Sequence, residues 1–293
     1  MSFSTRTLRP VVKNLVQARP APVQVRNMAT LREIEMRLKS VKNIEKITNS
    51  MKVIASTRLA KATRAMGTAQ KYGAANNELF NNAEAKSEGG KVLLVAISSD
   101  SGLCGGIHSS ITKATKRAVA ANPDAKIVVL GDRPKAQLSR AFPEKLELSF
   151  SAVGKDIPTF ATASQVADEI LNAGIEFDEI HLIYNKFISA IAYEAETIKI
   201  LSEKALKDGA GFTKYEMEEE VTDDQVKFAL ANGIYAALVE GHAAEISARR
   251  TAMENASKNA KDMMGSLQMQ YNRGRQAVIT NELIDIITGA SAL

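Results

Sequence analysis

The chain has 293 residues, a formal charge of +5, no tryptophan and only 5% aromatic residues. So few aromatic rings disfavour a base-stacking platform for nucleic acids, and no apolar run reaches the roughly 20 residues that a transmembrane helix needs. The single cysteine, Cys104, excludes an internal disulfide and fits a reducing compartment. We therefore expect a protein that does not itself cross a membrane.

The positive charge is concentrated in residues 1–28, which hold five Lys or Arg and no acidic residue. With several Ser and Thr, this is the composition of a mitochondrial transit peptide, and Arg26, shortly before Met28 and the small Ala29, favours cleavage after Met28. Removing the segment leaves 33 Lys plus Arg against 33 Asp plus Glu. The net basicity is then a targeting signal and not a binding surface; the alternative is a basic tail that is never removed.

Residues 29–88 predict one long coiled-coil helix, which Gly89 and Gly90 end. Thr30 is a suitable N-cap, and Glu33 completes a capping-box pattern. An extra step of three in the apolar spacing predicts a stammer in the seam, which would run through Leu31, Ile34, Leu38, Val41, Ile44, Ile47, Met51 and Ile54. Nine Lys or Arg and one acid lie between residues 37 and 71. Such a face is either solvated or bound to an acidic partner.

Residues 89–205 predict a small Rossmann-like α/β domain. Short apolar runs that alternate with helical stretches favour a parallel sheet. The predicted strands are 91–97, 126–130 and 179–185, the predicted helices are 107–121, 134–142 and 161–173, and residues 188–201 look like an added edge strand.

Residues 206–221 predict an exposed acidic connection, and residues 222–293 a C-terminal helix that Thr222 caps and nothing interrupts before Gly289. At 1.5 Å per residue this helix is about 100 Å long, so it must project beyond the α/β domain. Several of its seam positions are small or polar: Met253, Ala256, Ala260, Met263, Leu267, Tyr271, Gly274 and Val278. Because two-stranded coiled coils usually carry larger aliphatics there, we expect the two terminal helices to form an antiparallel pair that something else supports from outside.

The loop SSDSGLCGGIHSS (98–110) is the best candidate for catalysis, since its glycines follow a strand and open a helix, where a backbone can approach a phosphate. It lacks both the GxGxxG and the Walker Lys-Ser/Thr patterns, so a tight strand-to-helix crossover is the favoured interpretation. Cys104 in this loop could be a nucleophile, but we place none of the three histidines (108, 181 and 242) near it in sequence, so any pairing would be purely spatial and a small buried thiol is favoured. No HxxxH or CxxC spacing indicates a metal site. We identify no catalytic, cofactor-binding or metal-binding residue.

Three segments closely resemble the gamma-subunit family of the rotary, proton-driven ATP synthases: ITNSMKVIASTRLAKA (47–62), SDSGLCGG (99–106) and the stretch from Ala248 to the C-terminus. Their order and spacing match over essentially the whole chain after residue 28. The resemblance implies a non-catalytic central shaft, whose coiled coil lies inside a ring of alpha and beta subunits while the α/β domain sits on the membrane-embedded c-ring. It also implies the small stalk subunits delta and epsilon as partners, and a peripheral place on the matrix side of the mitochondrial inner membrane.

The family match also implies four contacts with beta subunits. Met51 would lie near an acidic loop of one beta subunit, whereas Arg275, Gln276 and Thr280 would meet the catch loop of another. In two respects the chain departs from relatives: Ser101 stands where the family commonly has an arginine, and the long cysteine-bearing insertion of the chloroplast form is missing. The missing insertion and the transit peptide favour mitochondria.

Two other classes of function stay open from the sequence. A nucleotide-binding α/β enzyme with a helical oligomerisation arm would bind ATP or NAD saturably. A nucleic-acid-binding arm would be retained by DNA in a strongly salt-dependent way, and the neutral charge after residue 28 argues against it.

Overall fold

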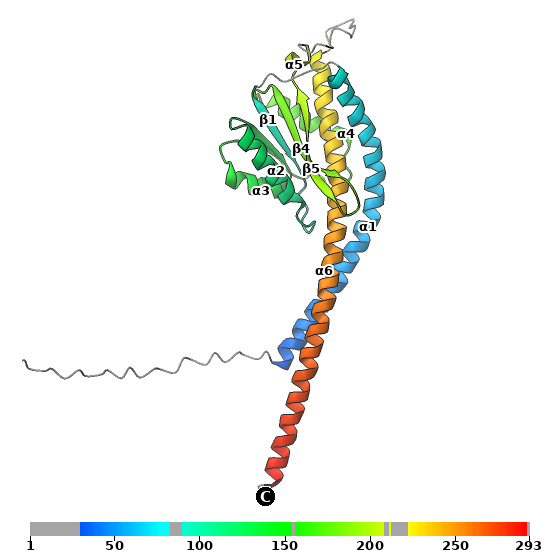
Figure 1. Ribbon diagram of the computed structural model, residues 1–293, viewed down its shortest axis with the longest axis vertical. Helices are drawn as coiled ribbons and strands as arrows, with labels where there is room; N and C mark the ends of the chain where they lie inside the picture. Colours follow the sequence, from blue (N-terminus) through cyan, green and yellow to red (C-terminus); the bar gives the residue numbers. More distant parts are fainter. Residues whose placement is uncertain (1–29, 83–89, 154–155, 208–210, 212–221, 292–293) are drawn as a thin grey trace, which may run out of the picture.

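The computed structural model describes residues 30–82, 90–153, 156–207, 211 and 222–291. Two long helices lie side by side, with a smaller α/β domain packed against one end of them (Figure 1). The predicted transit peptide and most of the predicted acidic connection lie outside the described residues. Within the described part of the chain, none of the helices combines the length and apolar character that a membrane span requires.

The α/β domain is built on a five-stranded sheet in the order β3-β2-β1-β4-β5. The strands are β1 (Val92–Ile97), β2 (Lys126–Leu130), β3 (Leu146–Phe150), β4 (Glu179–Phe187) and β5 (Tyr193–Leu201). Neighbouring strands are parallel except for β5, which is antiparallel to β4. The three predicted strands and the added edge strand are confirmed, although the edge strand begins only at Tyr193. β3 was not predicted.

One face of the sheet is covered by α2 (Ile107–Ala121) and α3 (Asp132–Ala141). Ile111, Val119 and Leu138 of these helices pack in one apolar cluster with the inward residues of β1 and β2. Both strands are therefore buried on two faces, which explains why they are continuous apolar runs and not alternating ones.

The other face is covered by α4 (Phe160–Asn172) and by the first part of α6 (Thr222–Ser291). Leu230 and Ile234 of α6 lie in the largest apolar cluster with residues of β1, β4 and α4. Gly233 permits this close approach, because a Cβ there would lie 2.8 Å from Cδ1 of Ile200 on β5. The start of α6 is thus a core helix of the α/β domain, and the remainder projects. A short helix, α5 (Glu203–Lys207), precedes it.

The first helix, α1 (Leu31–Asn82), runs antiparallel to α6, as expected. The predicted capping box is present: Glu33 N–H donates to Thr30 Oγ1 (3.4 Å), and Thr30 N–H donates to the Glu33 carboxylate (3.1 Å). An ion pair joins the two helices between Lys52 and Glu254 (2.7 Å). The 70 residues of α6 span about 105 Å, and the helix continues through Gly289, in agreement with the predicted range 222–293 over the residues that the structure describes.

The predicted stammer is wrong. The buried and half-buried positions of α1 repeat every three or four residues without interruption, through Leu31, Ile34, Leu38, Val41, Glu45, Thr48, Lys52, Ala55, Leu59, Ala62, Met66 and Ala69. Ile44, Ile47 and Ile54 instead lie on the outer face, 51%, 59% and 53% exposed. Thr48 can take a buried seam position because its hydroxyl donates to the Ile44 carbonyl (2.9 Å).

The seam of α6 needs a smaller correction. Met263 is 54% exposed, and Met264 takes the half-buried position in its place. Val278 is also exposed, since it lies beyond the start of α1.

Candidate functional site

The place where an α/β domain usually binds a ligand is closed in this chain. β1 leads towards β2 on one side and lies beside β4 on the other, so the carboxyl ends of β1 and β4 form a topological switch point. Leu238, His242 and Glu245 of α6 lie over this point and leave a cavity of about 20 Å³. Ligand pockets usually measure roughly 300–1,000 Å³, so this cavity cannot hold a nucleotide.

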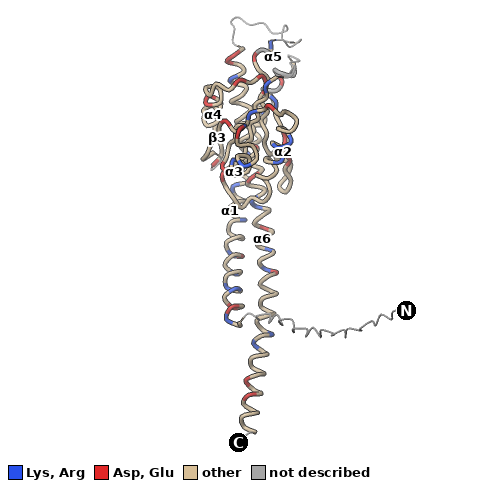
Figure 2. The backbone as a smooth tube through the Cα atoms, turned by 90° about the vertical axis from the view of Figure 1, so that its left-hand side faces the viewer, with Lys and Arg blue, Asp and Glu red and all other residues tan. Residues whose placement is uncertain are grey.

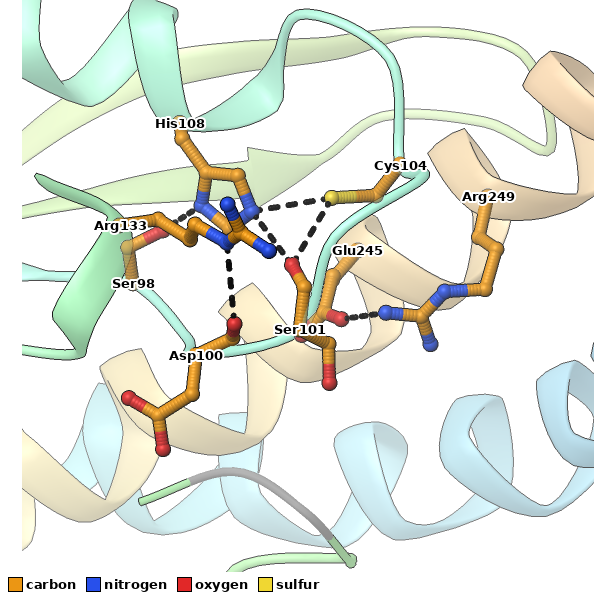
Figure 3. Close-up of polar contacts among 8 residues, drawn as sticks. All are labelled: Ser98, Asp100, Ser101, Cys104, His108, Arg133, Glu245 and Arg249. Atoms are coloured by element: carbon orange, nitrogen blue, oxygen red, sulfur yellow. Dashed lines mark hydrogen bonds and ion pairs between the residues drawn. The ribbon is translucent and has the colours of Figure 1, made fainter. Parts of the chain in front are cut away.

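The candidate catalytic loop follows β1 and leads into α2. Figure 3 shows the ring of His108 between Ser98 and Cys104. His108 Nε2 lies 3.0 Å from Cys104 Sγ and 2.8 Å from the Ser101 carbonyl oxygen, and Nδ1 lies 2.8 Å from Ser98 Oγ. The expectation that no histidine lies near Cys104 in sequence was wrong: His108 follows it by four residues, and the left-handed Leu103 (φ 61°) and Gly105 (φ 67°) turn the loop back.

This contact does not form a nucleophilic dyad. A carbonyl oxygen can only accept, so Nε2 must carry a hydrogen to bond Ser101, and it cannot then take the thiol proton. Burial raises the pKa of the Cys104 thiol to about 11, and the side chain is 1% exposed. The thiol is therefore buried, as predicted, and its raised pKa keeps it protonated. Among the described residues, no group of His, Cys, Asp or Glu is arranged to hold a metal ion.

A groove of about 340 Å³ lies beside this loop, between α1 and α6. Half-buried Met51 and exposed Arg58 line it from α1, Arg249 lines it from α6, and Ser101 lines it from the loop. Arg249 is held by an ion pair with the nearly buried Glu245, whereas Arg58 has no ion pair among the residues described. The groove thus combines a thioether with positive charge.

The other three predicted contact residues lie on a free tip of α6, which we define as residues 275–291. Leu31, at the start of α1, packs against Gly274, where a Cβ would come within 2.9 Å of it. Every residue from 275 to 291 is exposed. Arg275 and Gln276 therefore point into solvent, and Thr280 Oγ1 donates to the Gln276 carbonyl (2.8 Å).

The free tip is unusually apolar for an exposed helix. Its exposed large apolar residues are Val278, Ile279, Leu283, Ile284, Ile286 and Ile287. A single helix with such residues around its circumference is typical of a segment that a partner encloses.

The structure does not bring Met51 and the tip residues together. Lys52, next to Met51, pairs with Glu254, and Arg275 follows Glu254 by 21 residues, or about 30 Å of helix. The four predicted residues thus define two separate contact zones along one rod.

The basic face of α1 is largely open. Lys39, Lys42 and Lys46 are all exposed, and Figure 2 shows Lys and Arg along α1 where it runs beside α6. Among the described residues, the acidic residue of α6 that forms an ion pair with α1 is Glu254, and its partner is Lys52 and none of these three lysines. Most of this positive charge is therefore free to face another molecule.

Comparison with known proteins identifies the family. The protein-family model described as ATP synthase matches residues 30–293. The mitochondrial ATP synthase subunit gamma of Yarrowia lipolytica is 52% identical over 285 residues, which cover 94% of this chain and 97% of that protein. The chain belongs to the gamma-subunit family of ATP synthases.

Further relatives agree with this assignment. The gamma subunit of the mitochondrial F(1) complex of Rattus norvegicus is 44% identical over 272 residues, which cover 90% of this chain and 100% of that protein. A solved chain from the central stalk and c-ring of Tetrahymena thermophila mitochondrial ATP synthase is similar, with a TM-score of 0.62, 29% identity, and coverage of 72% of this chain and 99% of that chain. This gamma subunit is therefore non-catalytic and forms the rotary shaft of the central stalk.

Proposed function

We propose that this gamma subunit carries rotation of the c-ring to the catalytic beta subunits of mitochondrial ATP synthase. The observation that carries the proposal is the continuity of α6, which is a core helix of the α/β domain at one end and a free tip at the other. A torque applied to the α/β domain reaches the tip through α6, which has no break between Thr222 and Ser291.

The two ends of the rod suit different partners. The α/β domain and α5 lie at the end opposite the free tip (Figure 1), which fits a seat on the c-ring with the small delta and epsilon subunits beside it. The tip fits the interior of the alpha–beta ring. In this arrangement the gamma subunit is peripheral to the mitochondrial inner membrane, on the matrix side, and touches the membrane only through the c-ring.

Met51 belongs to the contact zone nearer the α/β domain. The groove that it lines carries Arg58 and Arg249, so a loop with carboxylates would find both charge and an apolar surface there. We assign this groove to an acidic loop of a beta subunit.

Arg275, Gln276 and Thr280 belong to the contact zone on the free tip. Arginine offers a planar fork of donors that suits a carboxylate, and glutamine adds an amide that both donates and accepts. All three residues are exposed on the tip, so they can hold a catch loop of another beta subunit in one rotary position. The competing interpretation is that they only solvate the helix end, where arginine favours the dipole by about 0.3–1 kcal/mol.

The double variant Arg275→Ala/Gln276→Ala tests this assignment. Hydrogen bonds to a charged group contribute about 1.5–3 kcal/mol, which corresponds to roughly 10- to 150-fold in an equilibrium. We expect ATP turnover and ATP-driven proton pumping to fall well below those of the control Lys258→Ala, an exposed change on the same helix. Membranes must contain equal amounts of assembled enzyme. Turnover equal to that of the control would return both residues to the solvated-helix interpretation.

A further inference from the structure

Three buried polar atoms lack a hydrogen-bond partner among the described residues: Ser99 Oγ, Asn185 Oδ1 and His242 Nδ1. Their residues are 4%, 3% and 9% exposed. All three residues line the same cavity of about 20 Å³ at the carboxyl ends of β1 and β4. Since buried polar atoms are paired in the great majority of cases, three around one cavity point to a shared partner.

The orientation of Asn185 is set by a second contact. Its Nδ2 donates to the Ile107 carbonyl (3.1 Å), so the group that still lacks a partner is Oδ1, which can only accept. The partner must therefore be a hydrogen-bond donor.

Ser99 and His242 place fewer limits on the partner than Asn185 does. The Ser99 hydroxyl both donates and accepts, and a neutral imidazole nitrogen does one or the other according to its tautomer. Burial lowers the pKa of His242, although neighbouring Glu245 opposes this shift, so the ring stays neutral near pH 7. A small partner with both donors and acceptors satisfies all three atoms.

The volume of the cavity and the charge of its lining restrict which molecule can be this partner. One water molecule needs roughly 10–15 Å³ of cavity volume, so the cavity of about 20 Å³ has room for one water molecule and little more. An anion would meet the acceptor oxygen of Asn185 and the carboxylate of Glu245, which also lines the cavity and is already held by Arg249.

We propose that one water molecule occupies this cavity and bridges the sheet to the shaft helix, donating to Asn185 Oδ1 and bonding Ser99 Oγ and His242 Nδ1. The bridge joins β1, β4 and α6. It gives the α/β domain and the shaft a directional link within an interface that is otherwise mostly apolar.

A high-resolution cryo-EM map of the intact ATP synthase tests the proposal directly. The expected result is a single peak about 2.6–3.2 Å from each of the three atoms. An empty cavity in a map that shows other buried waters would overturn the proposal, and so would density for a larger or more highly coordinated ligand.

Two variants test the bridge from opposite sides of the interface. Ser99→Ala removes the partner on the loop after β1, and His242→Leu removes the partner on α6. In assembled enzyme we expect a weaker peak and roughly fivefold faster amide exchange in peptides covering residues 97–107 and 236–246. The control Ser109→Ala, an exposed serine on α2, should change neither. Unchanged exchange in both variants would contradict the bridge, and if one variant fails to assemble the other still decides.

Discussion

Cys104 and His108 show how backbone geometry decides the chemistry of a side chain. The spacing of four residues could have signalled their contact, because α2 begins at Ile107 and the loop before it is short. What the sequence could not reveal is the Ser101 carbonyl, which accepts the Nε2 hydrogen and so prevents His108 from acting as a base towards the thiol.

The first prediction concerns the reactivity of Cys104. With its pKa raised to about 11, the native thiol should react with N-ethylmaleimide at pH 8 about 100-fold more slowly than the urea-unfolded chain, from the thiolate fraction alone. Burial should slow it further. Mass spectrometry of timed samples measures both rates. Similar rates in the native and unfolded chains would show that the loop opens readily.

The same pKa shift predicts a pH dependence of stability. The pKa is raised on folding from 9.0 to about 11, so the folded chain keeps a proton that the unfolded chain releases. The stabilising contribution is complete below pH 9 and is lost as the pH rises towards 11. Cys104→Ala should therefore lose less unfolding free energy than the parent chain between pH 9 and 11, as measured by urea titration at each pH. Equal losses would contradict the shift.

At the scale of elements, the fully buried strands were predicted well, whereas the half-exposed β3 was missed. β1 and β2 are continuous apolar runs because both of their faces are covered, and their predicted bounds agree with the structure to one residue or better. β3, with the sequence LELSF, is half-exposed and alternates, so it carries too few apolar residues to stand out. The cavity at the switch point is formed by three segments that lie more than 50 residues apart along the chain, so it could not be predicted.

The seam of α1 was misassigned for a different reason. Ile44, Ile47 and Ile54 are apolar but face outward, and periodicity cannot distinguish a residue that packs on its own chain from one that packs on a partner. We therefore expect a partner subunit to cover this outer face of α1 in the assembled enzyme.

The seam itself relies on small residues for close helix packing. Ala62 is 1% exposed and lies in a cluster with Val239 and Ala243 of α6. Ala62→Leu should destabilise the purified full-length chain by about 1–3 kcal/mol, because the two helices would have to move apart. Urea unfolding measures the loss. Ala60→Leu, on the exposed face of the same turn, is the matched control and should change stability by less than about 0.5 kcal/mol; similar losses for both would contradict the close packing.

At the scale of the whole molecule, α6 contributes both to the core of the α/β domain and to the projecting shaft. Ala260 is 6% exposed in the seam, midway between the α/β domain and the free tip. Ala260→Pro removes a helical hydrogen bond and clashes with the preceding turn, at a cost of about 3 kcal/mol or more. We expect failed assembly, or loss of coupling between proton flow and ATP synthesis. Normal ATP synthesis by membranes that carry fully assembled variant enzyme would contradict a stiff shaft.

The free tip also has a consequence for how the subunit is made. Its branched apolar side chains, among them Ile286 (68% exposed) and Ile287 (63% exposed), are not covered by any of the residues that the structure describes. We expect newly folded gamma subunits that have not yet assembled with the alpha–beta ring to associate with one another through these tips, because large exposed apolar patches drive aggregation. We therefore expect copies made in excess of the ring that encloses the tip to aggregate.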